Sequence, residues 1–328
     1  MPQPVTVSIS GLFRAAPPLR RRWADVAALV PAFHRIRTTP WLSALPTAAS
    51  VAETVVAIAG KRPKGRPAPA FRLLAQPGAA GALLAWGAPV AAVEREAPVV
   101  AFVGPPQVDA AVEKVVASGL RVAVVCPSDG EAVEPPPGGV WVDDAWAGEG
   151  ARGVLGVGVL SVASSHGVDV AAGLRGAAGL LAEANEPLAN NPIWSLARAL
   201  RVAAAELGRD GVVHLAAPEL ESLAAWVARS QATALSAASA AVAARPLPVR
   251  AELGDEDWLS AISGCRDVVV VVWQFAGSTP PALESLGAEG IPVLLVQLAA
   301  NDAESRGGAF ALWLSVLQVL AVLEQRAG

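Results

Sequence analysis

The stretch NNPIWSLARALRVAAAELGRDGVVHLAAPELESLAAWVARSQATALS, residues 190–236, contains the pattern that decides the fold. Its first part has helical periodicity over Asn191–Leu207, and begins with an asparagine and a proline that suit a helix cap and a first helical position. The apolar run Gly211–Leu215 then predicts a buried strand, and a second helical pattern covers Leu220–Val242. Helix, strand and helix in this order are typical of an α/β fold with a mainly parallel sheet.

Similar short apolar runs recur on both sides of this stretch, with helical patterns at Val108–Ser118 and Ala282–Ala288. Their nearly continuous apolar character is expected of strands that are covered on both faces. We therefore predict a doubly wound, mainly parallel architecture. The other predicted strands are Thr54–Ile58, Val99–Val103, Arg121–Val125, Val268–Trp273 and Pro292–Gln297.

The chain has 328 residues, which is enough for about two domains. Proline- and glycine-rich breaks at Lys61–Pro69 and Glu134–Gly139 interrupt its first half. We predict an N-terminal helical segment over residues 1–50, a first domain over 51–165 and a second domain over 166–328.

Composition excludes several classes of protein. With 53% apolar residues and 16% charged residues, the chain is too apolar to be disordered. Its net charge of −4 argues against a nucleic-acid binder. Two cysteines and three isolated histidines provide neither a disulfide framework nor a zinc site, so we expect no metal and no cofactor.

The sequence also argues against export and membrane insertion. The N-terminus lacks a continuous apolar segment followed by a small-residue cleavage site. The longest apolar stretch, Ala309–Leu323, is interrupted by Ser315 and Gln318 and is shorter than the roughly 18 residues of a spanning helix. We expect a buried C-terminal helix there, in a cytoplasmic globular protein.

In order, these landmarks resemble the phosphoglucose isomerases, an aldose–ketose isomerase family built from two sugar isomerase (SIS) domains. Residues 190–236 are similar to that family's passage from an Asn-Pro helix through a Gly-Arg-Asp turn to a strand and a tryptophan-bearing helix. Gly254–Trp258 (GDEDW) and the stretch GAEGIPVLLVQL are similar to bacterial members. The resemblance covers roughly residues 50–325 and implies two SIS-like αβα sandwich domains, each with a doubly wound, mainly parallel sheet.

The resemblance places a phosphate-binding loop at Gly104–Asp109, which reads GPPQVD. Such a loop binds a phosphate through backbone N–H groups, hydroxyls and a helix dipole. Here two prolines remove two donors, no hydroxyl is present, and Asp109 repels an anion. Gly104 and Gln107 remain as candidate ligand-binding residues in a loop that looks disabled.

The resemblance also places the catalytic carboxylate at Gln231, whose amide cannot act as a general base. Arg152 is the candidate survivor of a catalytic arginine, and both residues remain candidates for ligand contact. The family carries a lysine near its C-terminus, but no lysine follows Lys114 here. The alternatives are that Gln231 is an ordinary polar residue of a helix and that Arg152 is an exposed loop residue. His214, inside a strand, is interpreted as a satisfied core histidine.

These departures predict a catalytically inactive protein with a structural, regulatory or partner-binding role. We expect residual binding of a carbohydrate derivative such as a sugar phosphate, and a homo-oligomer or a protein partner. The alternative is an active sugar-phosphate isomerase of the glucose or mannose 6-phosphate class. Its acid would then come from Glu149, Glu183 or Glu186, which lie nearest in sequence to the expected site.

Overall fold

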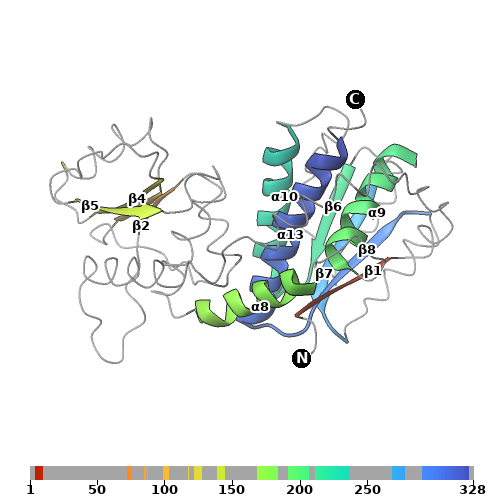
Figure 1. The fold of residues 1–328 in the computed structure, drawn as a ribbon, viewed down its shortest axis with the longest axis horizontal. Helices are drawn as coiled ribbons and strands as arrows, with labels where there is room; N and C mark the ends of the chain where they lie inside the picture. Colours follow the sequence, from red (N-terminus) through yellow and green to blue (C-terminus); the bar gives the residue numbers. More distant parts are fainter. Residues whose placement is uncertain are drawn as a thin grey trace. The chain divides into compact units, whose positions relative to one another are not determined.

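Backbone contacts divide the chain into two units, residues 1–39 with 172–328 and residues 40–171. Each unit contains a four-stranded sheet, so the mixed α/β class is confirmed (Figure 1). The expected domain bounds and the SIS-like nature of each unit stay predictions. The computed structural model describes residues 4–9, 72–75, 85, 87, 99–102, 117, 122–127, 139–144, 168–183, 191–206, 211–236, 268–277 and 290–324.

The described strands of residues 40–171 all pair in the parallel direction. Their order is β2 (Arg72–Ala75), β3 (Val99–Phe102), β4 (Val122–Pro127) and β5 (Gly139–Asp144). β3 and β4 confirm two predicted strands, whereas β2 and β5 were not predicted. β5 pairs with β4 along all six of its residues, so partner pairing outweighs its glycine and two aspartates, which disfavour strands.

The sheet of the other unit has the order β1-β8-β7-β6. β6 (Gly211–Ala216), β7 (Val268–Phe275) and β8 (Val293–Leu298) are parallel and confirm three predicted strands. β1 (Val5–Ile9) joins the edge of β8 in the antiparallel direction. This strand corrects our expectation of helix for that part of residues 1–50, because VTVSI alternates a buried Val5 with exposed Thr6 and Ser8, as an edge strand does.

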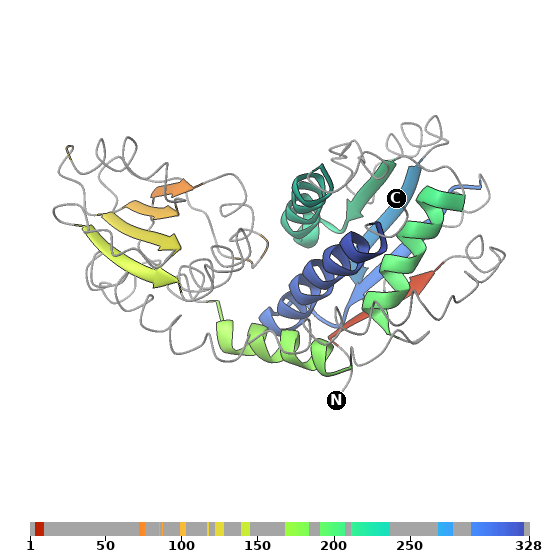
Figure 2. The same cartoon turned by 45° about the horizontal axis from the view of Figure 1, so that its top comes forward.

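Among the described residues, helices α9 (Pro192–Glu206), α10 (Glu221–Ser236) and α13 (Ala303–Glu324) lie over one face of this sheet, and the ribbon views show them side by side (Figure 2). α9 and α10 confirm predicted helices, and α13 confirms the C-terminal helix. The Oδ1 atom of Asn191 caps α9 by accepting hydrogen bonds from the backbone N–H groups of Ile193 and Trp194, at 3.0 and 3.2 Å. Within the described residues, no helix is both long and apolar enough to cross a bilayer.

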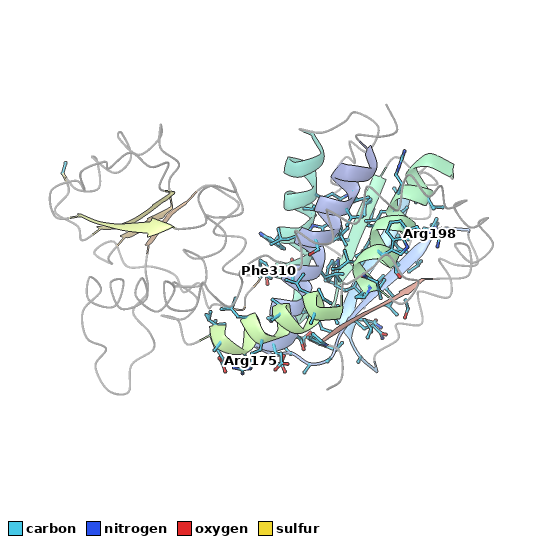
Figure 3. The ribbon with its side chains drawn as sticks, in the orientation of Figure 1. Arg175, Arg198 and Phe310 are labelled. Atoms are coloured by element: carbon cyan, nitrogen blue, oxygen red, sulfur yellow. The ribbon has the colours of Figure 1, made fainter. Side chains whose placement is uncertain are left out.

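Aromatic packing joins two of these helices. Phe310 of α13, labelled in Figure 3, stacks on Trp226 of α10 with ring centroids 4.0 Å apart. Both side chains are buried. Short helix η4 (Pro218–Leu220) connects β6 to α10 and buries Leu220. The predicted strand at 54–58 and the predicted helix at 282–288 lie outside the described residues, as does nearly all of the helix at 108–118.

Helix α8 (Val170–Glu183), which was not predicted, crosses the start of α13 at very short range. A Cβ atom added to Gly176 would lie 1.9 Å from the carbonyl oxygen of Glu304. A Cβ atom added to Gly307 of α13 would lie equally close to the carbonyl oxygen of Gly173. The two backbones therefore touch directly, and only glycine fits at these positions.

Candidate functional site

A buried histidine lies in the core between β6 and its covering helices. His214 is 6% exposed, and its Nε2 atom is 2.9 Å from Oε1 of Gln231 on α10. The indole Nε1–H of Trp273 on β7 donates to Nδ1 of His214 at 3.2 Å. Since an indole nitrogen only donates, Nδ1 must accept, and the proton of the neutral ring sits on Nε2. Nε2–H therefore donates to Gln231.

The surroundings of His214 keep it uncharged. Burial lowers the pKa of His214 to about 4, against a smaller opposing effect of its hydrogen bond to Gln231. Trp313 of α13 meets the imidazole edge-on with ring centroids 5.2 Å apart, and Trp273 and Trp313 are fully buried. These contacts confirm the interpretation of His214 as a satisfied core histidine.

Gln231 is 3% exposed and lies deep along α10 rather than at the start of the helix. Its amide oxygen is already engaged by His214. The pairing of these two residues was not predicted, although the resemblance singled out Gln231. Gly104, Gln107 and Arg152 lie outside the described residues, as do Glu149 and Glu186, while Glu183 ends α8.

The carboxyl ends of β6, β7 and β8 are the edge at which open α/β sheets bind ligands. Three backbone N–H groups at this edge extend the sheet pairing: Ala217 donates to Trp273, Ala276 to Leu298, and Ala299 to Pro4. Asp302 caps α13 by accepting from the backbone N–H of Ser305 at 2.8 Å. These three backbone N–H groups are therefore not available to a ligand.

Arg306, in the first turns of α13, links two loops of this edge. Its Nη2 atom donates to the carbonyl oxygen of Glu219 at 2.7 Å and to Oδ1 of Asn301 at 3.0 Å. The side chain is 7% exposed, and burial lowers the pKa of its guanidinium while Glu219 opposes that shift. Sequence reasoning missed this arginine, which ties the loop after β6 to the loop after β8.

A second buried amide lies at the same edge. Gln274, the last residue but one of β7, is 1% exposed, and among the described residues neither its Oε1 nor its Nε2 atom has a hydrogen-bond partner. Its register partner on β8 is Gln297, which is half-buried. The single polar residue near the end of the run VVVVVWQF was the signal that could have singled out Gln274. Among the described residues, no group of three histidines, cysteines or acids could hold a metal.

Comparisons with known proteins bear on the fold. No family model matches the sequence, and no curated protein matches it. Among solved structures, a hypothetical protein from Thermus thermophilus is 14% identical with a TM-score of 0.62, over 97% of this chain and 94% of that one. A glucose-6-phosphate isomerase from Chlamydia trachomatis is 12% identical with a TM-score of 0.61, over 95% of this chain and 72% of that one. The chain therefore has a fold like that of a glucose-6-phosphate isomerase, as the sequence resemblance predicts.

Proposed function

We propose that this chain is a non-catalytic protein with the fold of the phosphoglucose isomerases. Its role is structural, regulatory or partner-binding, with residual affinity for a carbohydrate derivative, in the cytoplasm. The observation that carries the proposal is the hydrogen bond between Gln231 and His214 in the core. Gln231, the position at which the sequence resemblance expects the catalytic carboxylate, is uncharged, buried and already engaged by a neighbour.

Aldose–ketose isomerisation through an enediol needs a base within about 3 Å of the proton that moves between C1 and C2. An amide has no proton-accepting state near pH 7. His214 cannot easily replace the base, because the lone pair of Nδ1, the nitrogen without a proton, already accepts a hydrogen bond from Trp273, and the ring is buried. Loss of the base typically lowers the rate by about 10² to 10⁴.

The loop at Gly104–Asp109 supports the same proposal. Its two prolines and its aspartate oppose the binding of a phosphate dianion, so a sugar phosphate lacks its usual anchor. A chain that keeps the fold without these groups fits a role in assembly with a second copy or with another protein.

The test is a coupled isomerase assay with glucose, fructose and mannose 6-phosphates. We expect no turnover above background, and none after Gln231→Glu, because the new carboxyl group would face His214 in the core. Circular dichroism of the variant provides the control for folding. A turnover above about 1 s⁻¹, near the bottom of the usual range for enzymes, would overturn the proposal and favour an active isomerase.

A further inference from the structure

Helix α8 contains the point at which the chain passes from one unit to the other, because the division between the units falls within its first turn. It lies against the start of α13 in both ribbon views (Figure 1, Figure 2). The contact is made by backbone on both sides, since Gly176 meets the carbonyl group of Glu304 and Gly307 meets that of Gly173. No flexible side chain lies between these atoms to absorb a displacement, and close-packed contacts transmit strain. A movement of α8 is therefore passed to the first turn of α13.

The first turn of α13 is in turn bonded to the loops at the carboxyl edge of the sheet. Oγ of Ser305 accepts a hydrogen bond from the backbone N–H of Ala300, in the loop after β8. Nη2 of Arg306 donates to Oδ1 of Asn301 in the same loop and to the carbonyl oxygen of Glu219 in the loop after β6. Along the helix, these two residues lie directly between the two positions at which α13 touches α8. One helical turn thus carries both the contact with α8 and the bonds that hold the two loops together.

The lengths of these bonds make the loops sensitive to small movements of that turn. A donor and an acceptor more than about 3.5 Å apart no longer form a hydrogen bond. The bonds to Ala300 and Asn301 measure 3.1 and 3.0 Å, so a displacement of about 0.5 Å along either bond breaks it. Residues 309–313 of α13 are all buried, so packing holds the body of the helix in place. The movement is therefore concentrated in the first turn and in the loops bonded to it.

We propose that the crossing of α8 and α13 is a conformational relay. A displacement of α8 moves the first turn of α13, breaks the bonds from Ser305 and Arg306, and lets the loops after β6 and β8 separate. These loops lie at the edge where open α/β sheets bind ligands, so the position of α8 controls the arrangement of that edge. Packed helices act on loops in this way because they have discrete arrangements rather than a continuous range of them. The relay does not depend on whether the protein is catalytic.

The experiment is hydrogen–deuterium exchange of the full chain, followed residue by residue by NMR. Gly176→Ala is the perturbation, because its methyl group needs about 1.5 Å of extra separation at the crossing. Gly179→Ala is the matched control, since nothing lies within 4 Å of that Cβ position. The reporter amides are those of Ala300 and Leu220, which are hydrogen-bonded in the two loops. Gly176→Ala accelerates their exchange about tenfold, as expected for the loss of one hydrogen bond, and Gly179→Ala leaves it unchanged.

An amide at the opposite end of the sheet separates the relay from a general loss of stability. The backbone N–H of Val270 donates to the carbonyl oxygen of Pro292, near the amino ends of β7 and β8. In the wild-type protein, Ala300 and Leu220 exchange faster than Val270, because loops open locally while the buried sheet opens only on unfolding. A merely structural role of the crossing would therefore accelerate Val270 alone. Unchanged loop amides in Gly176→Ala, or loop amides as slow as Val270 in the wild-type protein, would overturn the relay.

The reverse direction provides a second variant that leaves the crossing itself intact. Coupling between two parts of a protein is reciprocal, so freeing the loops must also loosen α8. Arg306→Lys keeps the positive charge but loses the planar group that reaches Asn301 and Glu219 together. This variant accelerates exchange of the Ala177 amide in α8 and leaves Val270 unchanged. Exchange at Ala177 equal to that of the wild-type protein would show that the helix and the loops are independent.

Discussion

Replacing Gly176 with alanine would place a methyl carbon 1.9 Å from the carbonyl oxygen of Glu304 and 2.7 Å from the carbon that bears it. Ordinary van der Waals contact for a Cβ atom begins at 3.4 Å, so the two backbones must separate by about 1.5 Å. Both obstructing atoms belong to the backbone of α13, which cannot rotate out of the way as a flexible side chain would. The helix crossing itself has to open.

The magnitude follows from two opposing effects. Overpacking of a close contact costs about 1–3 kcal/mol of stability, and alanine in place of glycine inside a helix returns about 0.5–1 kcal/mol. We therefore expect Gly176→Ala to lower the free energy of unfolding by about 1–2 kcal/mol. Gly179 lies one turn further along α8 with nothing within 4 Å of its Cβ position, so Gly179→Ala receives only the helical gain.

Thermal unfolding followed by circular dichroism measures this pair of variants. A change of 1 kcal/mol corresponds to a shift of about 2–4 °C in Tm for a unit of about 150–250 residues, and the unit formed by residues 1–39 and 172–328, which contains α13 and most of α8, falls in this range. We expect Gly176→Ala to melt below the wild-type protein and Gly179→Ala to melt at or above it. If both variants shift in the same direction by the same amount, the glycine contact between α8 and α13 does not exist as described.

Two further predictions concern the core histidine. Because burial holds the pKa of His214 at about 4, against 6.5 for an unperturbed histidine, the unfolded chain alone takes up this proton between pH 6.5 and pH 4. This contribution to stability is complete above pH 6.5 and is lost as the pH falls to 4, by about 3 kcal/mol in total. Urea unfolding between these pH values should show a steeper fall in the free energy of unfolding for the wild-type protein than for His214→Phe. Equal slopes would contradict the assignment. Gln231→Met removes the acceptor of the buried Nε2–H, so it should destabilise the protein by about 1–3 kcal/mol in urea unfolding, and an unchanged midpoint would show that His214 does not depend on Gln231.

Continuous apolar strands were the part of the fold that the sequence predicted best. β3, β4, β6, β7 and β8 are such runs, and burial on both faces leaves a pattern that a short window detects. β1 was missed because VTVSI alternates polar and apolar residues over only five positions, before a long segment without a comparable signal. β5 was missed because its glycine and aspartates resemble a loop, and only its pairing with β4 makes it a strand.

The candidate site was less predictable, since its contacts join residues that are distant in sequence. Gln231 lies 17 positions from His214, and their contact depends on how α10 packs against β6. The bridge from Arg306 to the carbonyl oxygen of Glu219 spans 87 positions. Gln274 carried a local signal, a polar residue within an apolar strand, but its burial without a hydrogen-bond partner among the described residues is a property of packing alone.

The antiparallel pairing of β1 with β8 has a consequence for how the protein is made. Residues 40–171 are contiguous, whereas the other unit needs both its first strand and its last. At synthesis rates of about 5–20 residues per second, Val5–Ile9 waits about 15–60 s for the residues of β8 to be translated. The contiguous unit can complete its sheet during that interval, and closure of the discontinuous one must follow the synthesis of β8. The earliest strand to be synthesised is thus among the last to be incorporated.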